Sequence, residues 1–260
     1  MKKSVISDFC EALLVLPLAI FFAWGDTKAR YRRSVLGPLW IVLGTAIGVA
    51  GLGFLWSSIL RVDKHEFIPS LTLGLVVWQF IAGCITESSL TYIHKASLIK
   101  NIRMPYFIFP IQVVLRQLIN FLHNFIVVIV VLCIFPPNLG FAQILFIPGL
   151  ILLLGNLLWI VSLVGLLGAR FRDLEQFVNA FMPIVFFLSP VIYPATRLGA
   201  VAKFVWLNPF SYMITLIRDP VQGNVPELFV YIWAFVLLVF GWLFTFWIYG
   251  KKRNRLAFWV

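Results

Sequence analysis

Charged side chains are scarce in this sequence, and acidic ones are the scarcest. Only 12% of the 260 residues are Asp, Glu, Lys or Arg, whereas soluble domains have about a quarter, and Asp and Glu together number 10. Hydrophobic residues make up 62%. This composition excludes an ordinary soluble domain. It indicates an integral membrane protein with too little polar sequence for a soluble catalytic domain.

Cysteine, histidine and short catalytic motifs are also rare. Cys10, Cys84 and Cys133 lie in apolar surroundings without C-x-x-C spacing, and the three histidines lie in three different segments. Neither a disulfide framework nor a metal site is predicted. The sequence contains no G-x-x-x-x-G-K-[ST] loop and no H-E-x-x-H motif. We therefore expect no ATP hydrolysis and no cofactor in this chain.

Long apolar runs are abundant, and they predict one all-α transmembrane domain over residues 1–260. An amphipathic interface helix at 5–26 and a re-entrant pair of short helices at 195–226 complete the predicted fold. In the fifth of six expected spans, Pro183 and Pro190 should bend or break the helix. The expected spans are 38–60, 68–90, 107–135, 141–169, 177–194 and 227–250.

Basic residues are concentrated in every second one of the links that join these spans. Fifteen of the 21 Lys and Arg residues lie in alternate links that begin with the N-terminus, five lie in the other links, and Arg116 is inside a span. By the positive-inside rule, both termini are cytoplasmic. The net charge of +11 is thus explained by orientation and anionic lipid, and no nucleic-acid partner is expected.

A basic collar, formed by Arg30, Tyr31, Arg32 and Arg33, precedes the first span in the segment KARYRRSVLGPLW (28–40). Clustered Lys and Arg beside a span is the ordinary marker of orientation. Guanidinium groups also pair well with phosphate oxygens, so the collar could bind an anionic headgroup. The two interpretations are compatible, and the residues alone leave both open.

Four polar residues are expected within the membrane. A bare charge in hydrocarbon is costly, so Arg116 should pair with Glu87 near the end of the second span, either as a structural pair or at a substrate contact. His123 and Asn124 in the third span are expected to form hydrogen bonds to neighbouring helices.

Aromatic residues make up 17% of the chain, and belts at the membrane interfaces account for many of them, but some lie where belts do not reach. Several group around helix-breaking prolines, where flat apolar rings would suit a sliding sugar chain, although packing and lipid contact explain many of them. The candidate lining residues are Trp40, Phe186, Phe187, Tyr193, Trp206, Phe210 and Tyr212.

Four segments together resemble the membrane subunit of polysaccharide ABC exporters, most of all the Wzm-type permease for O-antigen. They are RYRRSVLGPLW (30–40), SLIKNIRMP (97–105), FRDLEQFVNAFMPIVFFLSPVIYP (171–194) and WLNPFSYMITLIRDP (206–220). Related permeases export teichoic acid or capsule. The N-terminal helix is more apolar here than is usual in that family.

The resemblance implies a bacterial inner-membrane homodimer that encloses a translocation path and binds two copies of a separate ATPase, which holds ATP and Mg. The implied substrate is a polysaccharide on undecaprenyl pyrophosphate, contacted by the collar arginines. The link after the second span would be the coupling element to the ATPase, with Lys95, Lys100, Asn101 and Arg103.

Three other functions are conceivable from the sequence. A small-molecule or drug efflux permease would share the same frame. A membrane enzyme acting on lipid-linked sugars would need converging carboxylates or a histidine, and Glu87 is nearly alone within the spans. A passive channel would need no ATPase.

Overall fold

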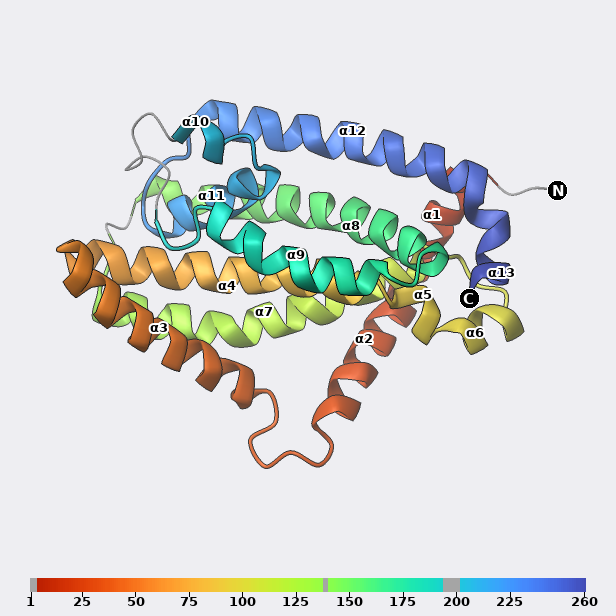
Figure 1. Cartoon of the computed structure of the whole chain (residues 1–260), viewed down its shortest axis with the longest axis horizontal. Coiled ribbons are helices and arrows are strands. Elements are labelled where there is room, and N and C mark those ends of the chain that lie inside the picture. Colours follow the sequence, from red (N-terminus) through yellow and green to blue (C-terminus); the bar gives the residue numbers. More distant parts are fainter. Residues whose placement is uncertain (1–3, 138–139, 194–201) are drawn as a thin grey trace.

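The computed structural model describes residues 4–137, 140–193 and 202–260, and every regular element in these ranges is a helix. Five helices are long and apolar enough to cross a membrane, and they run side by side in a bundle (Figure 1). The predicted class of an all-α integral membrane protein is therefore confirmed. The five helices are α3 (Leu39–Leu60), α4 (Lys64–Ser88), α7 (Ile108–Ile134), α8 (Phe146–Arg170) and α12 (Leu228–Lys252).

These helices occupy five of the six expected spans, and a short 3-10 helix, η1 (Phe141–Leu145), precedes α8. The fifth span is different. Helix α9 (Leu174–Leu188) has 15 residues, so it is about 22 Å long and shorter than the hydrocarbon core. It ends at Ser189, which is extended because the following Pro190 disfavours helical backbone. The expected continuation to residue 194 is not helical over 189–193.

Two short helices follow α9, as the sequence predicts, although residues 194–201 of that segment lie outside the described ranges. They are α10 (Ala202–Val205) and α11 (Pro209–Val221). Asn208 begins α11, because its side chain accepts a hydrogen bond from the Phe210 N–H at 3.0 Å and Pro209 suits the first turn. Helix α11 packs among α4, α8 and α12, and its central residues are buried. Its re-entrant placement in a bilayer stays a prediction.

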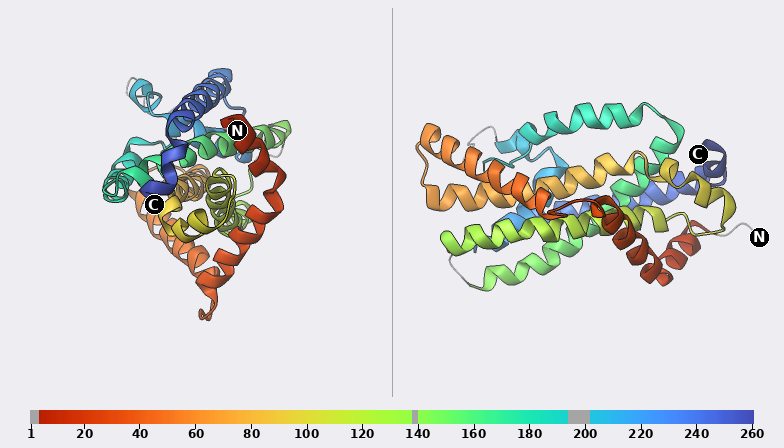
Figure 2. Two further views of the ribbon diagram at one scale, coloured as in Figure 1. Left: turned by 90° about the vertical axis from the view of Figure 1, so that its right-hand side faces the viewer. Right: turned by 90° about the horizontal axis from the view of Figure 1, so that it is seen from below.

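The N-terminal segment forms two helices, α1 (Val5–Leu14) and α2 (Leu16–Tyr31), which meet at an angle of 67°. The single interface helix expected at 5–26 is therefore broken at Val15, and α2 continues five residues further. Together the pair is apolar enough for a broken span, so its interfacial placement stays a prediction. The link from α2 to α3 projects away from the bundle (Figure 2).

Glycine allows two helices to approach α8 closely in the core. A Cβ built at Gly149 would lie 2.3 Å from the backbone oxygen of Leu216 in α11, and one at Gly168 would lie 2.0 Å from that of Ser89. By contrast, a Cβ built at Gly44 or Gly48 in α3 has no atom of the described chain within 4 Å outside the backbone of α3. Helix α4 is the most buried of the five long helices.

We expect Gly149→Ala to lower the free energy of unfolding by roughly 1–3 kcal/mol, because a methyl group there collides with backbone that cannot rotate away. Thermal unfolding of the detergent-solubilised chain measures the effect. Gly51→Ala is the matched control, since its position has open space, and it should leave stability unchanged or slightly higher. Equal effects of the two substitutions would contradict the close packing of α8 and α11.

Candidate functional site

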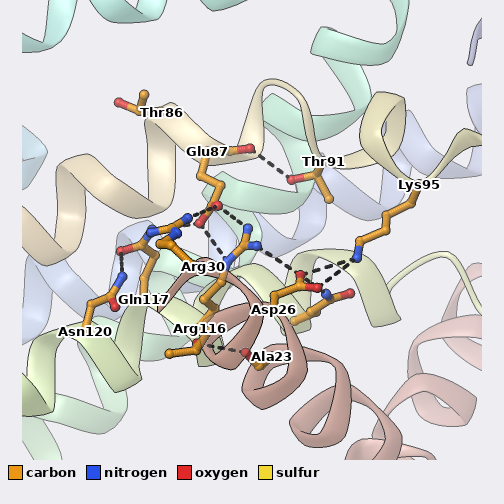
Figure 3. A network of polar contacts seen from close by, with 12 residues as sticks. Ala23, Asp26, Arg30, Thr86, Glu87, Thr91, Lys95, Arg116, Gln117 and Asn120 are labelled. Carbon is orange, nitrogen blue, oxygen red and sulfur yellow. Dashed lines mark hydrogen bonds and ion pairs between the residues drawn. The ribbon is translucent and has the colours of Figure 1, made fainter. Parts of the chain in front are cut away.

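An ionic cluster, formed by Asp26, Arg30, Glu87, Lys95 and Arg116, lies where α2 meets the bundle (Figure 3). Asp26 and Arg30 are one turn apart on α2, and Glu87 is near the end of α4. Lys95 lies between the short helices α5 (Thr91–His94) and α6 (Ala96–Asn101), and Arg116 is on α7. Segments far apart in the sequence thus supply one group of charges.

Arg116 is the centre of this cluster. Its guanidinium forms an ion pair with Glu87 through Nη2, and its Nε donates to Glu87 Oε2 at 3.1 Å. Its Nη1 lies 3.0 Å from Asp26 Oδ2. The side chains of Arg116 and Glu87 are 15% and 19% exposed. The pairing expected from the sequence is therefore present, and Asp26 is a second partner that the sequence analysis did not identify.

Each carboxylate has further donors. Asp26 Oδ2 accepts from Gln112 Nε2 at 2.6 Å and lies 3.3 Å from Lys95 Nζ, while Glu87 accepts from Gln117 Nε2 at 2.7 Å. Arg30 reaches Glu87 at 3.4 Å. Charge-assisted bonds of this kind are the strong ones, so α2 is attached to α4, α7 and the link after α5.

The cluster surrounds a cavity of about 250 Å³. Among the described lining residues, Arg30, Lys95 and Arg116 face two carboxylates, which leaves an excess of one positive charge. The Oε1 atom of Gln112 is buried there without a hydrogen-bond partner. The cavity can therefore accept one small anionic or donor group, or hold the helices together by charge alone.

The residues of the basic collar lie in two different environments in the structure. Arg30 faces the ionic cluster, whereas Arg32 and Arg33 follow the end of α2 and are exposed. Within the described residues these two arginines form no ion pair. Val35 is 98% exposed beside them, and Tyr31 is half-buried. Two guanidinium groups are thus free for an external anion.

Asn124 joins three helices, as expected, but His123 does not. Asn124 Nδ2 donates to Gln79 Oε1 in α4 at 2.8 Å, and Thr45 Oγ1 in α3 lies 3.0 Å from Asn124 Oδ1. The Nδ1 atom of His123 lies 2.7 Å from the Ile119 oxygen of its own helix. The expectation for His123 was wrong, because successive helical residues point in different directions.

The seven candidate lining aromatics do not form one group within the chain. Phe186 and Phe210 pack edge-on against Trp78 of α4, with ring centroids 5.8 and 6.0 Å apart, a contact missed from the sequence. Trp206 lies 5.4 Å from Tyr212 and 4.9 Å from Phe229 in a separate cluster with α12.

Of the other three candidates, Trp40 and Phe187 are exposed and Tyr193 is half-buried. Trp40 is 59% exposed and Phe187 is 68% exposed, and the Tyr193 hydroxyl donates to the Phe187 oxygen at 3.1 Å. A path lined by all seven rings therefore stays a prediction.

The predicted coupling residues lie at the end of the bundle that carries α1, α6 and the C-terminal helix (Figure 1). Lys100, Asn101 and Arg103 are exposed, whereas Lys95 is held by Asp26. Asp8 of α1 accepts from the Tyr106 N–H at 3.0 Å, so α1 is attached to the same link.

Long apolar helices joined by exposed basic links are typical of a multi-pass membrane protein. Residues 18–221 match the ABC-2 type transporter family, and the chain belongs to that family. The family resemblance drawn from the four motifs is thus confirmed.

Three similar proteins are each named O-antigen export system permease protein RfbA. One from Klebsiella pneumoniae is 27% identical over 89% of this chain and 90% of its own length. A second protein from that organism is 29% identical over 75% of this chain and 76% of its own length. One from Myxococcus xanthus is 24% identical over 76% of this chain and 77% of its own length.

Spacing in the sequence could have revealed the partners that were missed. Asp26 and Arg30 are four residues apart, as are Gln112 and Arg116, so each pair lies on one face of its helix. A polar pair of this spacing in an apolar helix indicates a face that meets other polar groups.

We expect Arg116→Met to lower the free energy of unfolding by roughly 2 kcal/mol, because it leaves two partly buried carboxylates without their shared cation. The double variant Arg116→Met/Glu87→Met should be more stable than the sum of the two single effects by at least about 1 kcal/mol. Unfolding in detergent measures both, and Arg103→Met, at an exposed position, is the control. Strictly additive effects would contradict the coupling.

Proposed function

We propose that this chain is the membrane subunit of an ATP-driven exporter of O-antigen. It moves polysaccharide linked to undecaprenyl pyrophosphate from the cytoplasmic to the outer side of the bacterial inner membrane. The supporting observation is the near full-length similarity to a permease named for O-antigen export. Two copies enclose the path and bind two copies of a separate ATPase that holds ATP and Mg, and both termini are cytoplasmic.

The collar is the proposed contact for the lipid pyrophosphate. Arg32 and Arg33 are exposed at the end of α2, on a link that projects from the bundle (Figure 2), so a lipid can reach them from the side. Arginine presents a planar fork of donors that matches phosphate oxygens. Arg30 is already paired with Glu87, so it connects this contact to the ionic cluster.

The ionic cluster is the proposed connection between the ATPase and the collar. Lys95 lies in the link that carries the coupling residues, and its partner Asp26 is one helical turn from Arg30. A displacement of this link therefore pulls on α2 through a charge-assisted bond. Arg116 keeps α2 against α7 while the link moves.

The aromatic rings are proposed to line the path in the dimer. Trp40 and Phe187 have exposed faces that a second copy or a sugar chain would cover. Phe186 packs against both Phe187 and Trp78, and Phe210 packs against Trp78. Apolar rings make few fixed hydrogen bonds, so a glycan can slide past them.

Replacing Arg32 and Arg33 together by Gln should reduce surface O-antigen about tenfold or more, because each loses a charged hydrogen bond to phosphate. Lipid-linked glycan should accumulate in the cytoplasmic leaflet. Both quantities are measured in cells that lack the native gene.

The matched control is Arg32→Lys/Arg33→Lys, which keeps the orientation charge but not the planar fork. If headgroup binding matters, this variant should keep the wild-type topology and still export less than the wild type. Normal surface glycan in a stably inserted Gln variant would contradict the pyrophosphate role. Full export by the Lys variant would reduce the collar to an orientation signal.

Reversing the charge of two coupling residues, Lys100→Glu/Arg103→Glu, should reduce copurification of the ATPase about tenfold while membrane insertion is preserved, because both side chains are exposed. Lys64→Glu/Lys203→Glu is the charge-matched control, because both side chains are exposed and belong to the start of α4 and to α10, at the other end of the bundle (Figure 1). Undiminished copurification of the first variant would place the coupling element elsewhere.

A further inference from the structure

A second cationic site lies between the ends of α8 and α12, beside the C-terminal helix α13 (Leu256–Trp259). It is a cavity of about 730 Å³, within the size range of small-molecule sites. Four basic side chains line it, namely Arg170, Lys251, Lys252 and Arg255, and we call it the basic pocket. It lies away from the α2–α3 link that carries the collar (Figure 1).

The charges of the basic pocket are not neutralised by the chain. Among its described lining residues there is no carboxylate. Within the described ranges, Lys252 and Arg255 form no ion pair and no side-chain hydrogen bond, and both are exposed. Four like charges around one cavity repel one another, so an anion bound there relieves that repulsion.

Aromatic rings hold two of the cations at the wall. Lys251 Nζ lies 3.8 Å from the ring centroid of Trp247, and the Arg170 guanidinium lies 5.7 Å from Trp259 and 5.8 Å from Phe171. Arg172 Nη2 donates to the Trp259 oxygen at 3.0 Å and fixes α13 over the cavity. The wall is therefore built by contacts between three elements.

Apolar surface continues from the pocket along α12. Leu166, Leu167 and Ile248 form part of its lining, and Trp247 is 57% exposed. Phe244, one turn before Trp247, is 50% exposed, and the two rings stack at 6.1 Å. A ligand with an anionic head and an apolar tail fits this combination, with its head at the cations and its tail along α12.

We propose that the basic pocket binds an anionic phospholipid, with the headgroup phosphate at Lys252 and Arg255 and an acyl chain against the exposed face of α12. Basic pockets between membrane helices bind lipid phosphates by this chemistry. Trp247 and Trp259 also line the pocket, and tryptophan is enriched at the level of lipid headgroups, which supports a headgroup at this site. The site is separate from the collar and serves a structural lipid, so it does not depend on the exported substrate.

The test measures phosphatidylglycerol bound to the purified full chain by native mass spectrometry, with phosphatidylcholine as the neutral lipid. Lys252→Gln/Arg255→Gln should bind phosphatidylglycerol about 25-fold more weakly, at about fivefold for each cation lost, and phosphatidylcholine equally. Lys64→Gln/Lys203→Gln removes two exposed cations elsewhere and should retain wild-type binding. Thermal unfolding without lipid verifies that both variants fold.

Three results would overturn the proposal. The first is equal binding of phosphatidylglycerol by the pocket variant and the wild type. The second is stabilisation by inorganic phosphate or glycerol phosphate as large as that by the lipid, which would identify a site for a small free anion. The third is loss of ATPase copurification in the pocket variant with lipid binding unchanged, which would identify a protein contact.

Discussion

The structure depends on one physical constraint, which is that a charge among apolar helices must have partners. Arg116 satisfies it with two carboxylates from different elements, Asp26 on α2 and Glu87 on α4. Leaving any one of the three unpaired would place a partly buried charge in apolar surroundings, at a cost of roughly 2 kcal/mol. The ion pairs of Arg116 therefore help to place α2, and with it the collar, against α4 and α7.

Close packing in the rest of the bundle supports this arrangement. Helix α4 is surrounded by α3, α7, α8 and α11, and glycines let backbones meet where side chains would separate them. Helix α9 has only 15 residues, and α11 packs in the core beside α8 and α12. Close packing at Gly168 and Ser89 therefore lies next to Glu87 of the ionic cluster, whereas the packing at Gly149 and Leu216 joins α8 to α11.

Positive charge is distributed in three settings with different chemistry. In the ionic cluster it is nearly balanced by carboxylates, in the collar two arginines are free on a projecting link, and in the basic pocket four cations share aromatic walls. The same two residue types therefore attach a helix in the ionic cluster, and they carry the proposed anion contact in the collar and the proposed lipid site in the basic pocket. The surroundings of each cation decide among these roles.

The sequence by itself determined the membrane class, the positions of five long helices and the family, because long apolar runs and ordered motifs are local signals. It also indicated Arg116 with Glu87. Only the tertiary structure decided the rest: that Asp26 joins the pair, that His123 turns to its own helix, that the aromatics separate into groups, and that Arg170 meets Lys252 in a pocket. These contacts join residues distant in the chain, and the angle between helices, which no local pattern encodes, sets which side chains meet.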